Sequence, residues 1–412
     1  MHIKTEDLKK GMRFSKDVFF DDGQCLLLAA GNTMSDRELR ALNQWKVLFV
    51  VTDGKILQQD EDIELETLET LDDELEEVED ITNTIYIEGS QLSDENITLV
   101  SKMVVFNLPK EVKESAPYQD YKNILKKIEE VFSSIKEGKS LSSRELSKEA
   151  EMIVSIAQSH PEESVMILLS ANIEDDQASL EILNTALLVS ILSFAMNLEK
   201  TVILNAVIAT LFHRIGTLKF PSPAMHKKEA LTDAELQILN TQISFAQKLV
   251  VNEIGYSEDI ARIIEQQHER WDGKGKPKAL AGENIEIEAR VIAVADEFIS
   301  MLGKKEHKKP IMSYEAVKNL LADSAHAVDP NIVKVVVQCL GLYPIGSIVL
   351  LNDGSICKVV KTATDAPLRP VVEVVLSETG KISSETQKQI IDLKTEKAKV
   401  ILRAVDPRVY LH

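Results

Sequence analysis

The segment from Ser179 to Leu198 restricts the fold more than any other part of the chain, because apolar residues cover nearly every side of it. A helix without a polar side must be surrounded by other elements, so this segment predicts a central buried helix. Earlier in the chain, residues 121–135 carry apolar side chains at helical spacing and predict an amphipathic helix. Its apolar positions are Tyr121, Ile124, Leu125, Ile128, Val131, Phe132 and Ile135.

The helical pattern continues to about residue 340. Another apolar helix is expected from Val202 to Phe212, where it runs into His213. Prolines and glycines separate the segments that follow, which indicates short connections between helices. Further helices are expected at 232–252, 257–270, 286–302, 313–325 and 330–340.

Both ends of the chain carry strand patterns. Near the N-terminus, MRFSKDVFF and CLLLAAGN predict two strands joined at Asp21-Asp22-Gly23, then a helix that begins at Ser35 and a strand at KVLFVVTDG. Near the C-terminus, GSIVLL and ICKVVKT flank Asn352-Asp353-Gly354, which is a hairpin signal. The strands VVEVVL and VILRAV complete a small β module.

The sequence thus predicts a multidomain, mainly α protein. We expect an α/β module at 1–57, an acidic linker region at 58–117, a helical bundle domain at 118–341 and a β module at 342–412. Residues 60–80 hold 13 Asp and Glu and no Lys or Arg. This segment is interpreted as a solvated linker, or alternatively as a short amphipathic helix that docks or self-pairs through Leu68, Leu71, Leu75 and Val78.

The charge balance excludes several classes of function. The chain has 412 residues and a net charge of −19, which argues against broad binding to a nucleic acid polymer or to an anionic membrane surface. No apolar run is long enough to predict a membrane span, and the first residues lack the apolar centre of a signal peptide. The three cysteines, Cys25, Cys339 and Cys357, are far apart, so we expect a cytoplasmic protein without a disulfide framework.

The residues that could carry chemistry lie between 211 and 310. His213 follows an apolar helix, His268 and Glu269 precede a glycine-rich turn, and Asp296 lies inside the apolar helical run VIAVADEF. These side chains could converge on one metal ion. The alternative for His213 is a hydrogen-bonded core histidine, whereas Asp296 needs a cation or several donors if it is buried.

Several phrases of this region resemble the HD-GYP family of cyclic-di-GMP phosphodiesterases, a branch of the HD-domain metal-dependent phosphohydrolases. The resemblance rests on LTDAE, HERWDGKGKP and RVIAVADEF, and it extends to the tail YPIGSIVLLNDGSICKVV and to the start LKKGMRFSKDV. It implies a bacterial signalling protein with an HD-type helical bundle. It also implies an active site in which two or three metal ions, usually iron or manganese, activate water to attack a phosphodiester.

Only three of the seven motif ligand positions keep the family's residue: His213, His268 and Asp296. The other four are replaced, with Asn184 and Gln242 at histidine positions, Gln267 at the first histidine of HHE, and Arg214 at the bridging aspartate of HDIGK. A neutral amide is a poor ligand for a transition metal, and a guanidinium stays positively charged. We therefore expect Arg214 to pair with Asp296 in place of the metal, with the three amides completing a polar network.

The resemblance leaves the function of this degenerate site open. A pseudoenzyme without a cofactor is expected, which acts by protein interaction, by cyclic-di-GMP binding or by both. The alternative is a phosphodiesterase in which His213, His268 and Asp296, with Glu269 or His226, hold one iron, manganese or zinc ion. A structural adaptor that uses the end modules and residues 60–80 is the third interpretation.

The resemblance also suggests ligands and partners. Lys276 replaces the tyrosine of GYP, and Lys305 and Lys308 stand at the two arginine positions of the family's RxYR phrase. These lysines are candidates for phosphate binding, although a lysine lacks the bidentate geometry of arginine; a solvated loop is the alternative. By analogy with the family, a GGDEF-type or other signalling protein is a candidate partner, and a homodimer is expected.

Overall fold

The computed structural model forms two compact units, Met1–Glu76 and Glu77–His412. The described residues of the first unit are 2–5, 8–9, 12–14, 18–19, 26–28, 42, 49–52 and 56–57, and those of the second are 108–139, 141–170, 177–220, 232–303, 311–324, 326–379, 381 and 388–405. The acidic segment 60–80, the turn at 21–23, Cys25 and nearly all of the helix expected from Ser35 lie outside these residues.

The described part of the first unit contains short strands in two sheets. A four-stranded sheet has the order β1-β5-β3-β4, and β2 pairs with β6. The expectation of one continuous strand at MRFSKDVFF is wrong, because β2 pairs with β6 while β3 pairs with β4 and β5. The strands are β1 (His2–Lys4), β2 (Arg13–Phe14), β3 (Val18–Phe19), β4 (Leu26–Leu28), β5 (Phe49–Thr52) and β6 (Ile56–Leu57).

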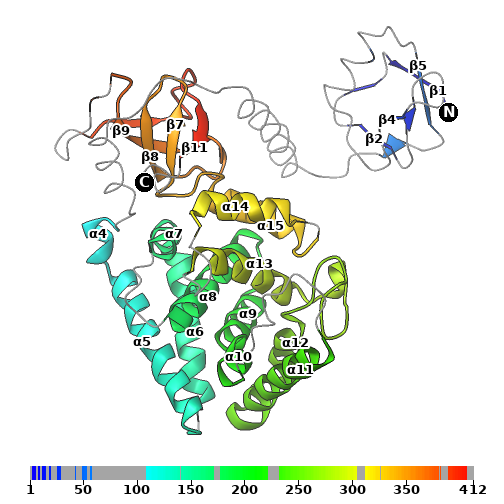
Figure 1. Ribbon diagram of the computed structural model, residues 1–412, viewed down its shortest axis with the longest axis vertical. Helices are drawn as coiled ribbons and strands as arrows, with labels where there is room; N and C mark the ends of the chain where they lie inside the picture. The colour runs from blue at the N-terminus through cyan, green and yellow to red at the C-terminus, as the bar shows by residue number, and fades with distance from the viewer. Residues whose placement is uncertain are drawn as a thin grey trace. The chain divides into compact units, whose positions relative to one another are not determined.

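The second unit is mainly helical, as the sequence predicts (Figure 1). The helices are α4 (Lys110–Lys113), α5 (Ala116–Lys136), α6 (Ser143–Ser159), α7 (Pro161–Leu169), α8 (Gln177–Ala195), α9 (Lys200–Phe212), α10 (Ile215–Lys219), α11 (Asp233–Lys248), η3 (Leu249–Ile254), α12 (Glu258–Gln266), η4 (Gly282–Asn284), α13 (Ile287–Leu302), α14 (Ser313–Ala322) and α15 (Pro330–Leu340).

Helix α8 is the centre of the bundle, because it packs against α5, α6, α7, α9, α13 and α15. Its side chains from Ser179 to Ser193 are buried, including the polar Glu181 and Asn184. By length and composition, Ala178–Ala195 could cross a membrane, but 83% of this window is buried inside the protein. A core helix passes the same test, so the central buried helix expected from the sequence accounts for it.

Helix α12 ends at Gln266, four residues before the helix expected at 257–270. The chain turns there because Glu269 takes another role: its carboxylate accepts hydrogen bonds from the backbone N–H groups of Lys278 (2.7 Å) and Leu280 (3.0 Å). Gly275 lies inside this loop, and a Cβ at that position would come within 2.2 Å of the backbone nitrogen of Arg270. The loop therefore has a tightly determined shape.

The C-terminal strands form one antiparallel sheet with the order β10-β9-β8-β7-β11. The hairpin expected around Asn352-Asp353-Gly354 is present, since β7 pairs with β8 in antiparallel register. The strands are β7 (Ile348–Leu351), β8 (Ile356–Lys361), β9 (Val371–Leu376), β10 (Ile390–Asp392) and β11 (Ile401–Ala404). Residues 341–349, which lead from α15 into this sheet, are all buried.

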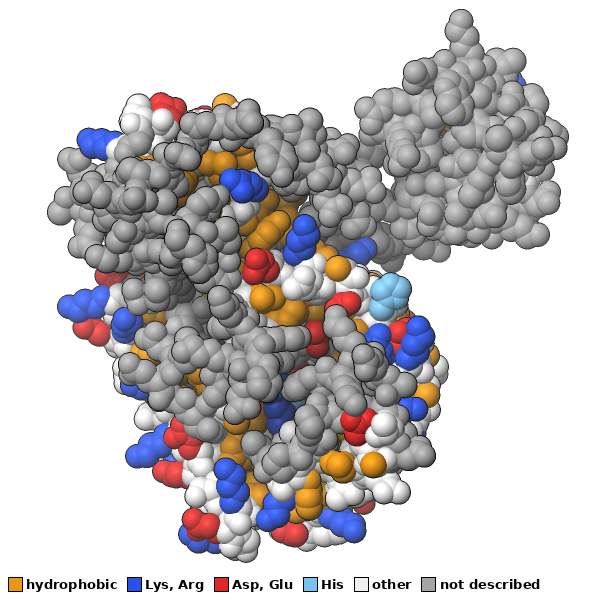
Figure 2. Space-filling model, in the orientation of Figure 1, with side chains coloured by type: hydrophobic (Ala, Val, Ile, Leu, Met, Phe, Trp, Pro, Cys, Tyr) orange, Lys and Arg blue, Asp and Glu red, His pale blue; other side chains and the backbone are white. Residues whose placement is uncertain are grey.

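Charged side chains of both signs are mixed over the helical region on the face that Figure 2 shows. Among the described residues, many form ion pairs across a single helix or between neighbouring elements, such as Lys127–Glu130 and Lys361–Glu162. Such exposed pairs contribute little to stability. The charges that carry information about function are the buried ones.

Candidate functional site

A break between two helices places His213 and Arg214 next to each other. Helix α9 ends at Phe212, and Arg214 is the residue before α10 begins at Ile215. Gly216 allows α10 to lie against α11, since a Cβ at Gly216 would come within 2.4 Å of the backbone oxygen of Gln242. The short break thus directs the His213 and Arg214 side chains toward α8 and α13.

The guanidinium of Arg214 is held between two carboxylates from different helices. Its Nη1 donates to Glu181 Oε2 on α8, and its Nη2 donates to Asp296 Oδ1 on α13. Its Nε donates to the same Asp296 oxygen at 3.1 Å. The Arg214–Asp296 pair expected from the sequence is therefore present. Charge-assisted hydrogen bonds of this kind are about twice as strong as neutral ones.

His213 completes the cluster. Its Nδ1 lies 2.5 Å from the backbone oxygen of Thr210, which can only accept, so Nδ1 carries a proton. Its Nε2 lies 3.0 Å from Asp296 Oδ1 and 3.2 Å from Arg214 Nε. Both atoms that Nε2 faces thus belong to the Arg214–Asp296 pair, and the histidine serves as a hydrogen-bonded member of this cluster.

The cluster changes the ionisation of its members. Burial by itself would raise the pKa of Asp296, but the charges of Arg214 and His213 and their hydrogen bonds outweigh it and hold this pKa well below its usual range. Burial acts to lower the pKa of Arg214, whereas Asp296 and Glu181 raise it above its ordinary value. Arg214 and Asp296 are therefore both charged at neutral pH.

Glu181 is a member of this cluster that the motif comparison did not identify. Its side chain is 9% exposed, and it lies on α8 three residues before Asn184. A signal for it existed in the sequence, because it is the one charged residue between Ser179 and Glu199. A buried carboxylate needs a cation, and Arg214 supplies it.

The three amides do not complete the Arg214 network, so that expectation is wrong. Asn184 Oδ1 accepts from the hydroxyl of Tyr121 at 2.7 Å, and Gln242 Nε2 donates to the backbone oxygen of Phe220 at 2.6 Å. The Oε1 atoms of Gln242 and Gln267 are buried and have no hydrogen-bond partner within the part of the chain that the structure describes. Asn184 and Gln242 thus bond to neighbouring groups instead of to Arg214, and the Oε1 atoms of Gln242 and Gln267 accept no hydrogen bond from the described residues.

The remaining candidate residues have other surroundings or lie outside the described part of the chain. His268 is half-buried and follows α12, and its neighbour Glu269 is fully used in holding the loop to residue 280. The Lys276 side chain is exposed. His226, Lys305 and Lys308 lie outside the described residues.

The donor set does not fit a metal ion. No group of three His, Cys, Asp or Glu side chains within the described ranges could hold one. Asp296 Oδ1 already accepts twice from Arg214 and lies 3.0 Å from His213 Nε2, and a guanidinium lies where a cation would have to approach. His213 and Asp296 are therefore brought together, but not as two ligands of an open metal site.

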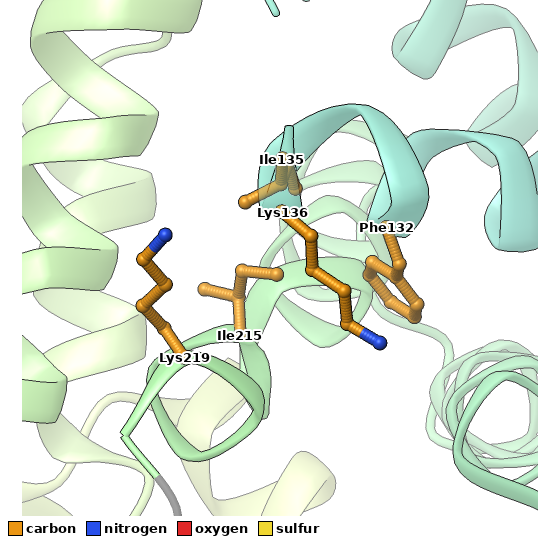
Figure 3. A pocket seen from close by; sticks show the side chains of 5 residues that line it. All are labelled: Phe132, Ile135, Lys136, Ile215 and Lys219. Atoms are coloured by element: carbon orange, nitrogen blue, oxygen red, sulfur yellow. The ribbon is translucent and has the colours of Figure 1, made fainter. Parts of the chain in front are cut away.

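A pocket lies beside this cluster, between the end of α5 and α10. It is lined by Phe132, Ile135, Lys136, Ile215 and Lys219, and the Nζ atoms of the two lysines point away from each other (Figure 3). None of the motif positions contributes to its wall. The pocket is mainly apolar, and neither of its lysines belongs to the Arg214 cluster.

Comparison with known proteins identifies two families along the chain. Residues 168–332 match the HD domain, and residues 348–412 match the KOW domain associated with HD domain. The first match contains every described residue of the Arg214 cluster. The second covers the sheet from β7 to β11.

Curated relatives match the same region. Cyclic di-GMP phosphodiesterase PdeB of Borreliella burgdorferi is 31% identical over 50% of this chain and 54% of its own length. A cyclic di-GMP phosphodiesterase of Pseudomonas aeruginosa is 26% identical over 57% of this chain and 56% of its own length. The chain thus spans just over half the length of these relatives.

A solved structure, the HDG"Y"P protein Bd1817 from Bdellovibrio bacteriovorus, matches 82% of this chain and 97% of its own, with 13% identity and a TM-score of 0.41. That score is too low to bear on the fold. The HD-domain match and the phosphodiesterase relatives, in contrast, agree with the HERWDGKGKP and RVIAVADEF phrases on the region that holds the cluster. Residues 168–332 of the chain are an HD domain, and over this region the chain resembles the HD-GYP phosphodiesterases.

Proposed function

We propose that this protein is a non-hydrolysing HD-GYP-like signalling protein of the bacterial cytoplasm, which acts through protein contacts, cyclic-di-GMP binding or both. The observation that carries the proposal is the placement of Arg214 between Glu181 and Asp296. The family's hydrolysis depends on metal ions that activate water. The guanidinium lies between the two carboxylates, where its fixed positive charge opposes the binding of a metal cation.

The charges of the cluster also work against a phosphodiester at this position. All three nitrogens of the Arg214 guanidinium donate to carboxylates or to His213, so the side chain keeps little capacity to bind a phosphate. Two carboxylates beside it repel an anion at short range. Any nucleotide would therefore bind mainly through groups outside the cluster, and exposed Lys276 is one candidate.

The alternative is a metal-dependent cyclic-di-GMP phosphodiesterase with a reduced metal site. The specific observation in its favour is that the relatives matched over the HD region are named cyclic di-GMP phosphodiesterases. It would require the Arg214 side chain to leave Asp296 before a metal ion could bind. Because the two activities differ in one measurable step, hydrolysis, they can be separated directly.

The test is a hydrolysis assay on the full chain with cyclic-di-GMP in the presence of Mn²⁺ or Fe²⁺, combined with calorimetric titration of the intact nucleotide. We expect no hydrolysis above background, with the titration reporting whether the nucleotide binds. The matched control is the double variant Gln242→His, Gln267→His, which we expect to stay inactive because Arg214 still fills the site. Metal-dependent hydrolysis by the natural chain that disappears in Asp296→Asn would refute the proposal and establish the alternative.

A further inference from the structure

We propose that Glu181 and Arg214 act as one structural unit in which the guanidinium is the fixed cation of the centre, so that α8, α10 and α13 are held together without a metal ion. This inference deepens the proposed function and rests on it, because both take the centre to be free of metal. What it adds is a role for Glu181, which lies at none of the family's motif positions considered above.

The three charged residues come from different elements of the bundle. Glu181 belongs to α8, Asp296 to α13, and Arg214 to the residue that precedes α10. The three are 33 and 82 residues apart along the chain, yet one planar group reaches both carboxylates. The guanidinium thus joins three elements at the middle of the bundle, as a bridging cation would.

The guanidinium also balances the charges of the two carboxylates. Two carboxylates in partly buried positions repel each other unless a cation lies between them. The exposed fractions are 9% for the Glu181 side chain, 32% for Asp296 and 20% for Arg214, so water screens this repulsion only in part. An arginine stays protonated under all ordinary conditions, which makes it a permanent counter-ion that a chelator cannot remove.

Glu181 lies in buried, mostly apolar surroundings. Every neighbour of this residue on α8 from Ser179 to Ser193 is buried, and most are apolar. A carboxylate there costs free energy unless a charged partner meets it. With Glu181 in place, Nη1 is fixed, and the plane of the guanidinium is set so that Nε and Nη2 both reach Asp296. Glu181 is therefore a positioning residue for Arg214.

The experiment is a double-mutant cycle on the full chain, read as the midpoint of thermal unfolding in EDTA and again in Mn²⁺. The variants are Glu181→Gln, Arg214→Met and their combination. Each single change should lower the midpoint by about 5–10 °C, because it leaves a buried charge without its partner. The double variant should lose clearly less than the sum of the two losses, because it removes both charges together.

Arg290→Met provides the matched control, since Arg290 is a second buried arginine of the same domain that pairs with Asp329 instead. Its loss should add to that of Glu181→Gln, because no hydrogen bond or ion pair joins these two residues. The natural chain should keep the same midpoint, within about 1 °C, in EDTA and in Mn²⁺, because Mn²⁺ does not bind the folded state.

Additive losses for Glu181→Gln and Arg214→Met, or a midpoint of the natural chain that Mn²⁺ raises by several degrees, would overturn the inference. If Arg214→Met fails to fold, Glu181→Gln alone decides, since an unchanged midpoint in EDTA would refute a role for Glu181. Hydrolysis by the natural chain together with a coupled Glu181–Arg214 pair would refute the proposed function and leave this inference standing. If the chain does not hydrolyse the nucleotide and the losses at Glu181 and Arg214 are additive, this inference is refuted and the proposed function stands.

Discussion

Arg214 and Arg290 both pair with carboxylates inside the helical domain, but their surroundings differ. Arg290 on α13 donates through Nη1 to Asp329 at 2.8 Å, and Asp329 also accepts from the backbone N–H of Asn331 at the start of α15. Arg290 lies over the ring of Trp271, 5.8 Å from its centroid, and its Nε is buried without a partner among the described residues. Arg214, in contrast, uses all three nitrogens on two carboxylates and a histidine.

The difference separates an ordinary structural ion pair from a replaced functional centre. Asp329 would have a role without Arg290, because it caps α15 through Asn331. Asp296 has no helix-capping role, since it lies in the interior of α13, and its described partners are Arg214 and His213. Arginine therefore supports Asp329 but is required by Asp296.

The largest expected effect comes from removing each arginine in turn. Arg214→Ala should lower the free energy of unfolding by about 3–5 kcal/mol, since it removes the cation that lies between the Glu181 and Asp296 carboxylates. Arg290→Ala should cost about 2–3 kcal/mol, because Asp329 keeps its bond to the α15 backbone. Urea unfolding of both variants beside the natural chain measures the two values. Equal losses would show that the second carboxylate at Arg214 contributes nothing.

The ionised Asp296 carboxylate should also make the stability of the natural chain fall at acidic pH. The pKa of Asp296 is depressed in the folded state, so its contribution is complete above the unfolded value near 3.8 and is lost as the pH falls toward the folded value. Between pH 5 and pH 3 the natural chain should lose about 1 kcal/mol from this group.

The variant Arg214→Ala removes the main cause of that depression, so its stability should fall less steeply over the same interval. Unfolding in urea at pH 5, 4 and 3 gives the two slopes, and Arg290→Ala serves as the control that should keep the slope of the natural chain. A slope that Arg214→Ala leaves unchanged would mean that Arg214 does not hold Asp296 ionised.

The smallest expected effect tests a neutral contact at the same centre. Tyr121→Phe removes the hydroxyl that donates to Asn184 Oδ1, and this should cost about 1 kcal/mol. Tyr118→Phe is the matched control, since Tyr118 stacks on Tyr121 with ring centroids 6.4 Å apart, whereas the bond to Asn184 comes from the Tyr121 hydroxyl. A loss at Tyr121 as large as that at Arg214 would mean that hydrogen bonding, and not charge, dominates the centre.

Much of the helical fold follows from the sequence because helical periodicity is a local signal. The central helix at Ser179 to Leu198 and the helix from Val202 to Phe212 needed only their own residues to be recognised, and the structure contains them as α8 and α9. The end of α12 did not follow, because it depends on Glu269 bonding to the backbone of residues 278 and 280. Periodicity does not register such a contact.

The site shows the same limit. The pairing of Arg214 with Asp296 could be expected from charge alone, since a buried carboxylate needs a cation. The partners of Asn184 and Gln242 could not, because amides bond to whichever donor or acceptor the fold brings near, here Tyr121 and the backbone of Phe220. Glu181 was within reach as an isolated charge in an apolar helix, but its partner only appears once α8 and the end of α9 are side by side.

The junction between α15 and the C-terminal sheet sets how these two parts work together. Residues 341–349 are buried, and a Cβ at Gly341 would come within 2.9 Å of the side chain of Thr362, the residue that follows β8. The rings of Tyr314 on α14 and Tyr343 in the junction stack 5.2 Å apart. A junction packed in this way is rigid, so a displacement of the sheet on binding would be transmitted to α15. A chain cut at this point would expose the apolar faces of both parts.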